Sequence, residues 1–281
     1  MAQRSTSSIS ADAMPTWRLI LGAGSDRVPG AATGARNMAV DHALLESVQQ
    51  GGRPVLRLYR WDPACLSLGR NQHAEGIFDA ARAAALGIDV VRRPTGGLAV
   101  LHDRELTYCV LAPLAAVGRP RVAYHRINQA IIRALNALGV TASAAAGGAA
   151  RSPRSDSAEP CFGTPARGEV MARGRKLVGS AQRCERRALL QHGSILLEGS
   201  QSAALQSIAM TAGAGGNGDA ITLAELLGAP PSIDEVAGLL RLGFEETFGT
   251  RLAPETLTRE ENARADTYAS YYGAATWTWR R

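Results

Sequence analysis

The segment CFGTPARGEVMARGRKLVGSAQ, residues 161–182, carries two side chains that could do covalent or electrostatic chemistry. Cys161 and Lys176 lie fifteen positions apart, and Lys176 is the single lysine of the chain. A cysteine can serve as a nucleophile, as a redox thiol or as a small structural residue. The segment alone leaves these three interpretations open. A lysine that follows a tight turn can point from the start of a strand into a cleft, or it can lie on a surface strand.

A second stretch, RRPTGGLAVLHD at residues 92–103, combines bare backbone with hydrogen-bond donors. Gly96 and Gly97 would let the backbone approach a ligand closely. Arg92, Arg93 and Thr95 would supply donors beside it, so the stretch could bind an anion or a carbonyl group. The alternative is a tight turn that carries solvated arginines.

Two strand-like stretches contain residues that are unusual inside strands. Gly179 and Ser180 in GRKLVGSAQR indicate a β-bulge or the close approach of a ligand; the alternative is an ordinary surface strand. In LLQHGSILLE, an apolar strand is interrupted by Gln191, His192 and Gly193. An isolated histidine there is more often a structural residue than a catalytic one.

Composition excludes several classes of protein. The 281 residues are 46% hydrophobic and 20% charged, which is typical of a soluble globular protein. The formal net charge of +6 could suit nucleic acid, and it suits equally well an acidic protein partner or a phosphate-bearing cofactor. No apolar run could span a bilayer, and the N-terminus lacks the apolar centre of a secretory signal, so we expect a cytoplasmic protein without a membrane role. No basic motif interleaved with aromatic residues indicates nucleic acid.

The four cysteines are too widely spaced for a metal-binding knuckle, so we expect no metal site. Cys65 and Cys109 lie in apolar, strand-like runs, where we expect them to be buried.

Hydrophobic periodicity predicts a mixture of helices and strands. Strands are expected at residues 17–21, 54–61, 65–69, 88–93, 98–102 and 105–113, and as a meander with hairpin turns at Gly174-Arg175 and in CERRA. Helices are expected at residues 37–52, 74–87, 124–139 and 232–249, and the tail should hold one more helix followed by a strand-like end. Flexible loops are expected at residues 141–160 and 213–219.

Consecutive strands often lack a helix between them, which favours an α+β fold with a central mixed, largely antiparallel sheet flanked by helices. We expect a polar tail at residues 1–16, one catalytic domain at 17–250 and a C-terminal extension of that domain at 251–281.

Three motifs in this order, RRPTGGLAVLHDRELTYCV, GRKLVGSAQR and LLQHGSILL, resemble the signature of the lipoate–protein ligase and octanoyltransferase family, which is related to biotin–protein ligases. Supporting pieces are NMAVDHALL, RLYRWDPACLSLGRNQ and ITLAELLG, and the resemblance covers residues 17 to 250. It implies an acyl chain that lies in an apolar tunnel.

The resemblance assigns roles to individual residues. Lys176 matches the lysine that binds the acyl carbonyl or acyl phosphate. Matches to the family's binding loop and to the other walls of its pocket are Arg93, Thr95, Gly96, Gly97, His102, Asp103, Gly179, Ser180, Gln182, His192 and Gly193. Leu98 stands where relatives usually carry glycine or arginine, which puts a phosphate contact at that position in doubt.

One transferase branch of the family carries a cysteine in a C-F-x-x-P-x-x-x-E stretch, and CFGTPARGE keeps this pattern, although Gly168 replaces a usual tyrosine. The resemblance thus implies that Cys161 carries the acyl group as a thioester; the alternative is a ligase, since some ligases of the family also carry a cysteine in this region without using it covalently. Lys176 would lower the pKa of the thiol and then act as general base for the incoming amine.

This branch takes an octanoyl or lipoyl group from acyl carrier protein and passes it to a lysine of a lipoyl domain of a 2-oxoacid dehydrogenase or of the glycine-cleavage H protein, with no cofactor. Three alternatives stay open: a ligase that uses ATP and Mg²⁺, an enzyme that moves octanoyl between lipoyl-domain proteins through a cysteine, and a non-catalytic partner subunit of a ligase.

Overall fold

The computed structural model describes residues 14–22, 30–146, 168–210 and 220–280. Cys161 and most of the loops expected at residues 141–160 and 213–219 lie outside these ranges.

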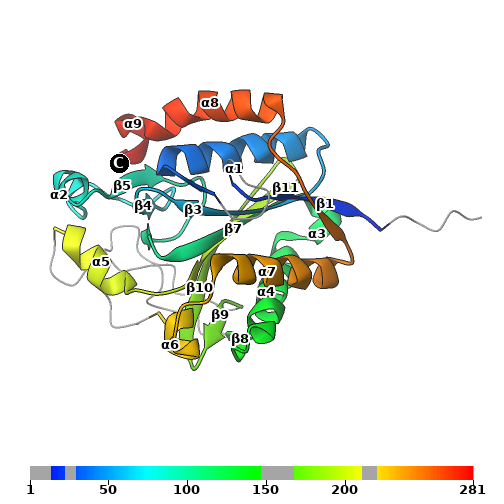
Figure 1. The fold of residues 1–281 in the computed structure, drawn as a ribbon. Helices are drawn as coiled ribbons and strands as arrows, with labels where there is room; N and C mark the ends of the chain where they lie inside the picture. The colour runs from blue at the N-terminus through cyan, green and yellow to red at the C-terminus, as the bar shows by residue number, and fades with distance from the viewer. Residues whose placement is uncertain (1–13, 23–29, 147–167, 211–219, 281) are drawn as a thin grey trace, which may run out of the picture.

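A nine-stranded mixed sheet forms the centre of the molecule (Figure 1). Its strand order is β12-β1-β3-β7-β11-β10-β9-β8, with β2 paired to β3. The pairs that β1 makes with β12 and β3, and the β2–β3 pair, are parallel, whereas every other pair is antiparallel. The strands are β1 (Thr16–Ile20), β2 (Ala31–Ala32), β3 (Val55–Trp61), β7 (Glu105–Pro113), β8 (Ala142–Ala144), β9 (Val170–Ala172), β10 (Arg175–Glu185), β11 (Ala188–Leu196) and β12 (Arg251–Pro254). The expectation of an α+β fold with a mixed, largely antiparallel sheet is therefore confirmed.

A second, three-stranded sheet was not expected from the sequence. It has the order β5-β4-β6 and consists of β4 (Cys65–Leu68), β5 (Asp89–Arg92) and β6 (Val100–His102). Its own apolar cluster includes Leu66, Leu68 and Phe78. This small sheet positions the 92–103 stretch, because β5 ends where the stretch begins and β6 ends at His102.

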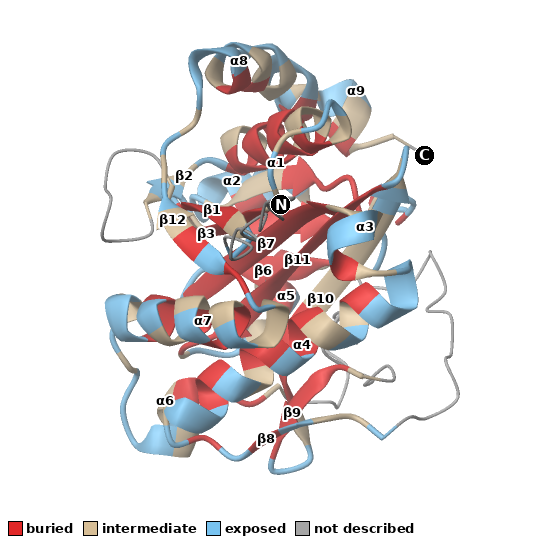
Figure 2. Ribbon diagram, turned by 90° about the vertical axis from the view of Figure 1, so that its right-hand side faces the viewer, coloured by how far each residue is buried: buried red, intermediate tan, exposed pale blue. Residues whose placement is uncertain are grey.

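Helices cover both faces of the large sheet. Helices α1 (Gly34–Gln49) and α8 (Arg259–Gly273) lie on one face, and α4 (Pro120–Ala137) and α7 (Ile233–Phe248) lie on the other (Figures 1 and 2). The shorter helices are α2 (Ala80–Ala85), α3 (Leu114–Val117), α5 (Gln201–Ile208), α6 (Leu223–Leu227) and α9 (Ala275–Thr278). No helix in the described ranges combines the length and the apolarity needed to cross a membrane.

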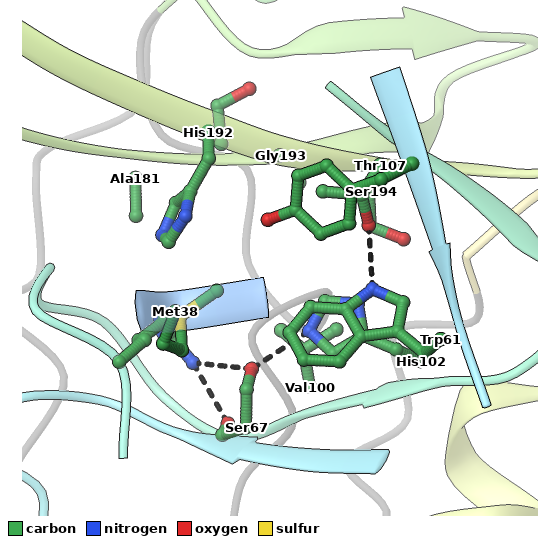
Figure 3. Close-up of a pocket in the computed structure, with 14 residues that line it drawn as sticks. Met38, Trp61, Ser67, Val100, His102, Thr107, Ala181, His192, Gly193 and Ser194 are labelled. Atoms are coloured by element: carbon green, nitrogen blue, oxygen red, sulfur yellow. Dashed lines mark hydrogen bonds between the residues drawn. The ribbon is translucent and has the colours of Figure 1, made fainter. Parts of the chain in front are cut away.

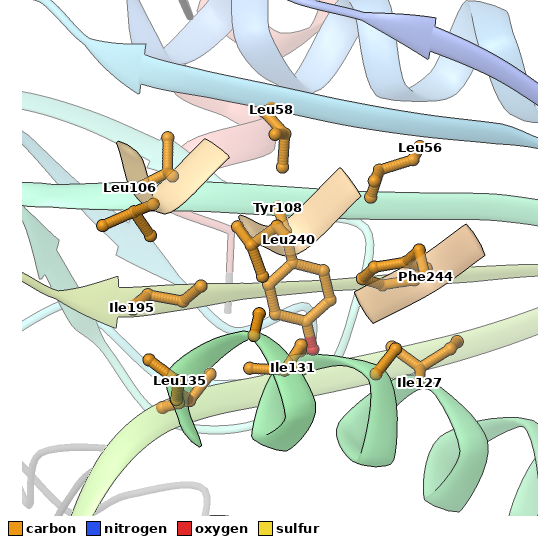
Figure 4. Close-up of a cluster of buried hydrophobic side chains, with 14 of the residues drawn as sticks. Leu56, Leu58, Leu106, Tyr108, Ile127, Ile131, Leu135, Ile195, Leu240 and Phe244 are labelled. Atoms are coloured by element: carbon orange, nitrogen blue, oxygen red, sulfur yellow. The ribbon is translucent and has the colours of Figure 1, made fainter. Parts of the chain in front are cut away.

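The larger core fills the space between the sheet and helices α4 and α7 (Figure 4). Ile127, Ile131 and Leu135 of α4 point from one helix face toward Leu240 and Phe244 of α7 and toward the sheet. The spacing of three or four residues in α4 produces this apolar face, as the sequence predicted. A second core, which includes the buried Cys65 and Cys109, lies between the sheet and α1 and α8.

Three local predictions need correction. Helix α2 begins at Ala80 rather than at residue 74, because the Asp79 side chain caps it and Phe78 forms a β-bridge with Ala209. In the C-terminal tail the strand precedes the helices, and β12 lies beside β1. The first hairpin turn is Arg173-Gly174, one residue earlier than expected, and both residues have positive φ. The turn in CERRA is confirmed, with Arg186 and Arg187 at positive φ.

Candidate active site

A pocket of about 390 Å³, counting the part open to solvent, lies between the small sheet and strands β10 and β11 (Figure 3). Its walls also include one residue of α1 and residues of β3 and β7. The lining residues are Met38, Tyr59, Trp61, Ser67, Arg93, Val100, His102, Thr107, Gly179, Ser180, Ala181, His192, Gly193 and Ser194. Six of the residues predicted for the site therefore line one pocket, although they are spread over a hundred positions of the chain.

Arg93 shapes the glycine loop through hydrogen bonds to backbone carbonyl groups. Its guanidinium group donates to the carbonyl oxygens of Ser67 at 2.8 Å, Gly96 at 2.9 Å and Leu98 at 2.7 Å. Arg92 and Arg93 are 0% and 4% exposed, so the interpretation of solvated arginines is wrong. Leu98 takes part in the loop through its backbone, while Gly96 and Gly97 are exposed.

His192 links the glycine loop to a buried carboxylate on α1. Its Nε2 is 2.6 Å from Thr95 Oγ1, and its Nδ1 is 3.4 Å from Asp41 Oδ2. Burial lowers the pKa of His192, so the imidazole is neutral. Because a carboxylate can only accept, Nδ1 carries the proton and Nε2 accepts from the Thr95 hydroxyl group. His192 therefore fixes the position of Thr95.

Asp41 is held as a carboxylate by its neighbours. It accepts a hydrogen bond from Arg57 Nη1 at 2.6 Å and another from the Tyr59 hydroxyl group at 2.9 Å. Burial alone would raise the pKa of Asp41, but Arg57 and His192 outweigh burial and lower it below the usual value.

His102 is packed against the side wall of the pocket. Its ring stacks on Trp61 at 4.1 Å, and its Nε2 is hydrogen-bonded to Ser67 Oγ at 2.8 Å. Glu105 Oε1 lies 3.4 Å from Nδ1 and accepts a hydrogen bond from Thr107. Ser67 Oγ also accepts from Arg93, so His102 braces the same loop from the other side.

Lys176 is buried in an ion pair. It is 2% exposed, and its Nζ donates to Glu169 Oε1 at 2.6 Å, while Glu169 is 5% exposed. The β9–β10 hairpin places the two residues: Glu169 immediately precedes β9, and Lys176 is the second residue of β10. The register of this hairpin shifts between Lys176 and Val178. The irregularity in β10 thus lies beside the lysine, whereas Gly179 and Ser180 pair regularly with β11.

Gly193 permits two strands and a side chain to come close together. A Cβ atom at Gly193 would lie 2.4 Å from the carbonyl oxygen of Gly179 and 2.7 Å from Tyr108. Ser180 Oγ is hydrogen-bonded to the Tyr108 hydroxyl group at 2.6 Å, which also accepts from Gln191. Glycine at position 193 therefore keeps this wall of the pocket open.

Other predicted residues lie away from the pocket lining. Asp103 is exposed in the turn between β6 and β7. Gln182 is half-buried and donates to the backbone of Pro120 and to Gln191. Lys176 and Thr95 adjoin the pocket through their strand and loop without lining it. Cys161 lies outside the described residues.

Sequence reasoning assigned no role to three buried acids that pair with predicted residues, although Glu169 was noted as the last residue of CFGTPARGE. They are Asp41, Glu105 and Glu169, the partners of His192, His102 and Lys176. A signal for Asp41 was present, since it falls on the apolar face of α1 three positions after Met38.

Asp41, Cys109 and His192 place one potential metal ligand each within 4.8 Å of the others. Asp41 is already bonded to Arg57 and Tyr59. Burial, followed by the charge of Asp41, raises the pKa of the Cys109 thiol, so this group is a poor metal ligand. The cluster therefore fits a structural role.

The chain is similar to known proteins over most of its length. The sequence model of the lipoyl protein ligase A/B catalytic domain matches residues 33–245. Octanoyltransferase LipM of Kyrpidia tusciae is 38% identical over 95% of this chain and 100% of its own length. Octanoyltransferase LipM of Geobacillus kaustophilus is 34% identical over 88% of this chain and 94% of its own.

Solved structures show the same fold. Protein Ta0514 of T. acidophilum, a candidate lipoate protein ligase solved with bound lipoic acid, has a TM-score of 0.76 at 25% identity and covers 93% of this chain and 98% of its own. A lipoate-protein ligase A bound with ATP has a TM-score of 0.75 at 25% identity, with the same coverage. The chain belongs to the lipoyl protein ligase A/B catalytic-domain family.

Proposed function

We propose that this protein is an octanoyltransferase of protein lipoylation, which moves an octanoyl group from acyl carrier protein through a Cys161 thioester to a lysine of a lipoyl-domain protein. The similarity to Octanoyltransferase LipM of Kyrpidia tusciae carries the proposal, because it extends over 95% of this chain and the whole of that relative. The acceptor is a lipoyl domain of a 2-oxoacid dehydrogenase or the glycine-cleavage H protein.

The pocket supports an acyl substrate. Met38, Val100 and Ala181 supply apolar surface, while hydrogen-bonded side chains hold the polar wall in place. An acyl chain in such a pocket is bound by burial of its methylene groups, each of which contributes about 0.8 kcal/mol.

The buried ion pair of Lys176 and Glu169 supports a role at the reacting carbonyl. An ammonium group with little access to water interacts strongly with a carbonyl oxygen that gains negative charge. In our proposal Lys176 binds that oxygen, and Glu169 holds the ammonium group in place.

The octanoyl group is transferred in two steps. The Cys161 thiolate attacks the thioester carbonyl, a new C–S bond forms, and the pantetheine thiolate leaves and takes up a proton. The acceptor amine then attacks the Cys161 thioester, an amide bond forms, and the Cys161 thiol is regenerated. Neither step needs ATP or a metal ion, so the transferase requires no cofactor.

The test compares two cysteines of the same protein. Cys161→Ala should abolish transfer, and mass spectrometry of the wild type with octanoyl-acyl carrier protein should show an octanoyl adduct on Cys161. Cys184→Ala is the matched control, because Cys184 is exposed and lies on β10 three residues beyond Ala181, outside the pocket lining. Full activity of Cys161→Ala would exclude the covalent mechanism.

A ligase is the second candidate, because a lipoate-protein ligase A bound with ATP shares the fold with a TM-score of 0.75. That reaction needs ATP and Mg²⁺. Lipoate-dependent exchange between ATP and pyrophosphate would identify it, and the transferase should show none.

A further inference from the structure

A second pocket lies beside the glycine loop and is lined by cationic and amide side chains. Its lining residues are Arg70, Asn71, Gln72, His73, Arg92 and Arg280. We call it the arginine pocket. Arg93 lines the acyl pocket, whereas the preceding Arg92 lines the arginine pocket. Successive side chains at the end of β5 point to opposite sides, so the two pockets flank one loop.

The positive charge of the arginine pocket has no carboxylate partner within the described ranges. Among the ion pairs that the described residues form, none includes Arg70, Arg92 or Arg280. Arg92 is 0% exposed and donates to the carbonyl oxygens of Gly69 at 2.7 Å and Gln72 at 2.6 Å. Burial, then the nearby Arg280 and Arg93, lowers the pKa of Arg92 to about 10. The guanidinium groups therefore repel one another, and a bound anion would relieve that repulsion.

The pocket also holds an unsatisfied donor. Gln72 is 3% exposed, and its Nε2 has no hydrogen-bond partner in the described structure. Its Oε1 accepts from the amide of Gly69 at 3.2 Å, which fixes the orientation of the side chain. A buried donor without a partner is costly, and this donor belongs to a side chain that lines the pocket.

Two guanidinium groups remain available for a ligand. Arg280 stacks on Trp277 at 3.9 Å and donates to the carbonyl oxygen of Arg70, so its position is fixed. The Arg70 side chain forms no hydrogen bond to another described residue. Guanidinium groups bind phosphate oxygens in a planar, paired geometry.

The arginine pocket is joined directly to the loop that borders the acyl pocket. The amide of Arg70 donates to the carbonyl oxygen of Thr95 at 2.8 Å. A Cβ atom at Gly69 would lie only 1.8 Å from the carbonyl oxygen of Gly97, so the two segments touch through bare backbone. A ligand in the arginine pocket therefore contacts the same structural unit as the acyl group.

We propose that the arginine pocket binds a phosphate-type oxyanion, and that this oxyanion is the phosphodiester of the pantetheine arm that carries the octanoyl group. The identity of the ligand rests on the proposed function, because acyl carrier protein presents its acyl group on a phosphopantetheine arm. The phosphodiester in the arginine pocket then directs the thioester end of the arm past the glycine loop to the acyl pocket.

Calorimetric binding to the full chain tests the proposal, with 4′-phosphopantetheine, pantetheine and inorganic phosphate as probes. The wild type should bind 4′-phosphopantetheine about tenfold or more tightly than pantetheine, because charge-assisted hydrogen bonds to the phosphate are gained. It should bind inorganic phosphate more weakly than 4′-phosphopantetheine, because the arm also contacts the loop. The variant Arg70→Gln/Arg280→Gln should bind 4′-phosphopantetheine and pantetheine alike.

Arg133→Gln is the matched control, since Arg133 is an exposed arginine of α4 paired with Glu246, and it should keep the wild-type preference. Equal binding of 4′-phosphopantetheine and pantetheine to the wild type would overturn the proposal, as would an unchanged preference in the double variant. Inorganic phosphate that binds as tightly as 4′-phosphopantetheine would overturn the assignment to the arm.

Transfer from octanoyl-pantetheine, which lacks the phosphate, separates this proposal from the proposed function. The double variant should transfer octanoyl from octanoyl-pantetheine at the wild-type rate. This result, together with the lost preference in binding, supports both this proposal and the proposed function. Absence of transfer from every octanoyl donor, with the preference for 4′-phosphopantetheine intact, would contradict the proposed function alone.

Discussion

The buried ion pair of Lys176 and Glu169 gives a quantitative prediction for the variant Glu169→Gln. The two residues are 2% and 5% exposed, and their charged atoms are 2.6 Å apart. Removal of one charge breaks this buried ion pair, which costs about 3–5 kcal/mol. Domains have a free energy of unfolding of about 5–15 kcal/mol, so this one change should remove a large part of it.

Urea unfolding followed by tryptophan fluorescence measures the loss, since the chain has four tryptophans. With an m-value of about 3 kcal/mol/M, the midpoint for Glu169→Gln should fall by about 1–2 M. The double variant Lys176→Met/Glu169→Leu should recover part of the loss, because it leaves no unpaired charge in the interior.

Glu225→Gln is the matched control, because Glu225 pairs at 2.8 Å with Arg175, the residue before Lys176, and both side chains are exposed. An exposed pair contributes about 0–1 kcal/mol, so its midpoint should barely change. The reasoning would be refuted if Glu169→Gln lost no more stability than Glu225→Gln.

Three further variants test the walls of the pocket. Gly193→Ala would place a Cβ atom 2.4 Å from the carbonyl oxygen of Gly179 and should lower the free energy of unfolding in urea by about 1–3 kcal/mol. The control Gly238→Ala, in open space on α7, should be neutral or stabilising. Equal losses of stability in the two variants would contradict the close approach at Gly193. The pKa of His192 is lowered in the folded protein, so the unfolded protein binds more protons, and the free energy of unfolding should fall as the pH drops below about 6.5. Urea titrations from pH 7 to 5 should show a smaller fall for His192→Gln than for the wild type. Thr95→Val removes the hydrogen bond to His192 and should raise the KM for the octanoyl donor, whereas Thr95→Ser should keep it; similar kinetics for both variants would show that the hydroxyl group is not needed.

The sequence predicted correctly those helices and strands whose ends are marked by neighbouring residues in the chain. Helix α7 begins after Ser232, whose side chain accepts from the amide of Glu235, and it ends at Gly249 in the left-handed conformation, as the sequence indicated. Alternation and apolar runs likewise placed the strands β3, β4 and β7 to within a residue or so.

Features that depend on distant pairing were not predictable from one sequence. The parallel pairing of β12 with β1 joins residues more than two hundred positions apart, so no local pattern reveals it. The start of α2 was misplaced because Phe78 pairs with Ala209, which propensity alone does not show.

The same limit applies to the candidate site. The glycine loop, His192 and Lys176 stood out by residue type, but the buried partners Asp41 and Glu105 depend on how α1 and β7 pack against β11 and β6. Without those contacts, His192 could not be recognised as the group that holds Thr95, nor Arg93 as a brace for its own loop.

Transfer of octanoyl from octanoyl-acyl carrier protein to an apo lipoyl domain, assayed by mass spectrometry with and without ATP, tests the proposed function most directly. The proposed octanoyltransferase should modify the acceptor lysine at the same rate in both conditions. Modification that requires ATP and free lipoate or octanoate, with none from octanoyl-acyl carrier protein, would contradict the account.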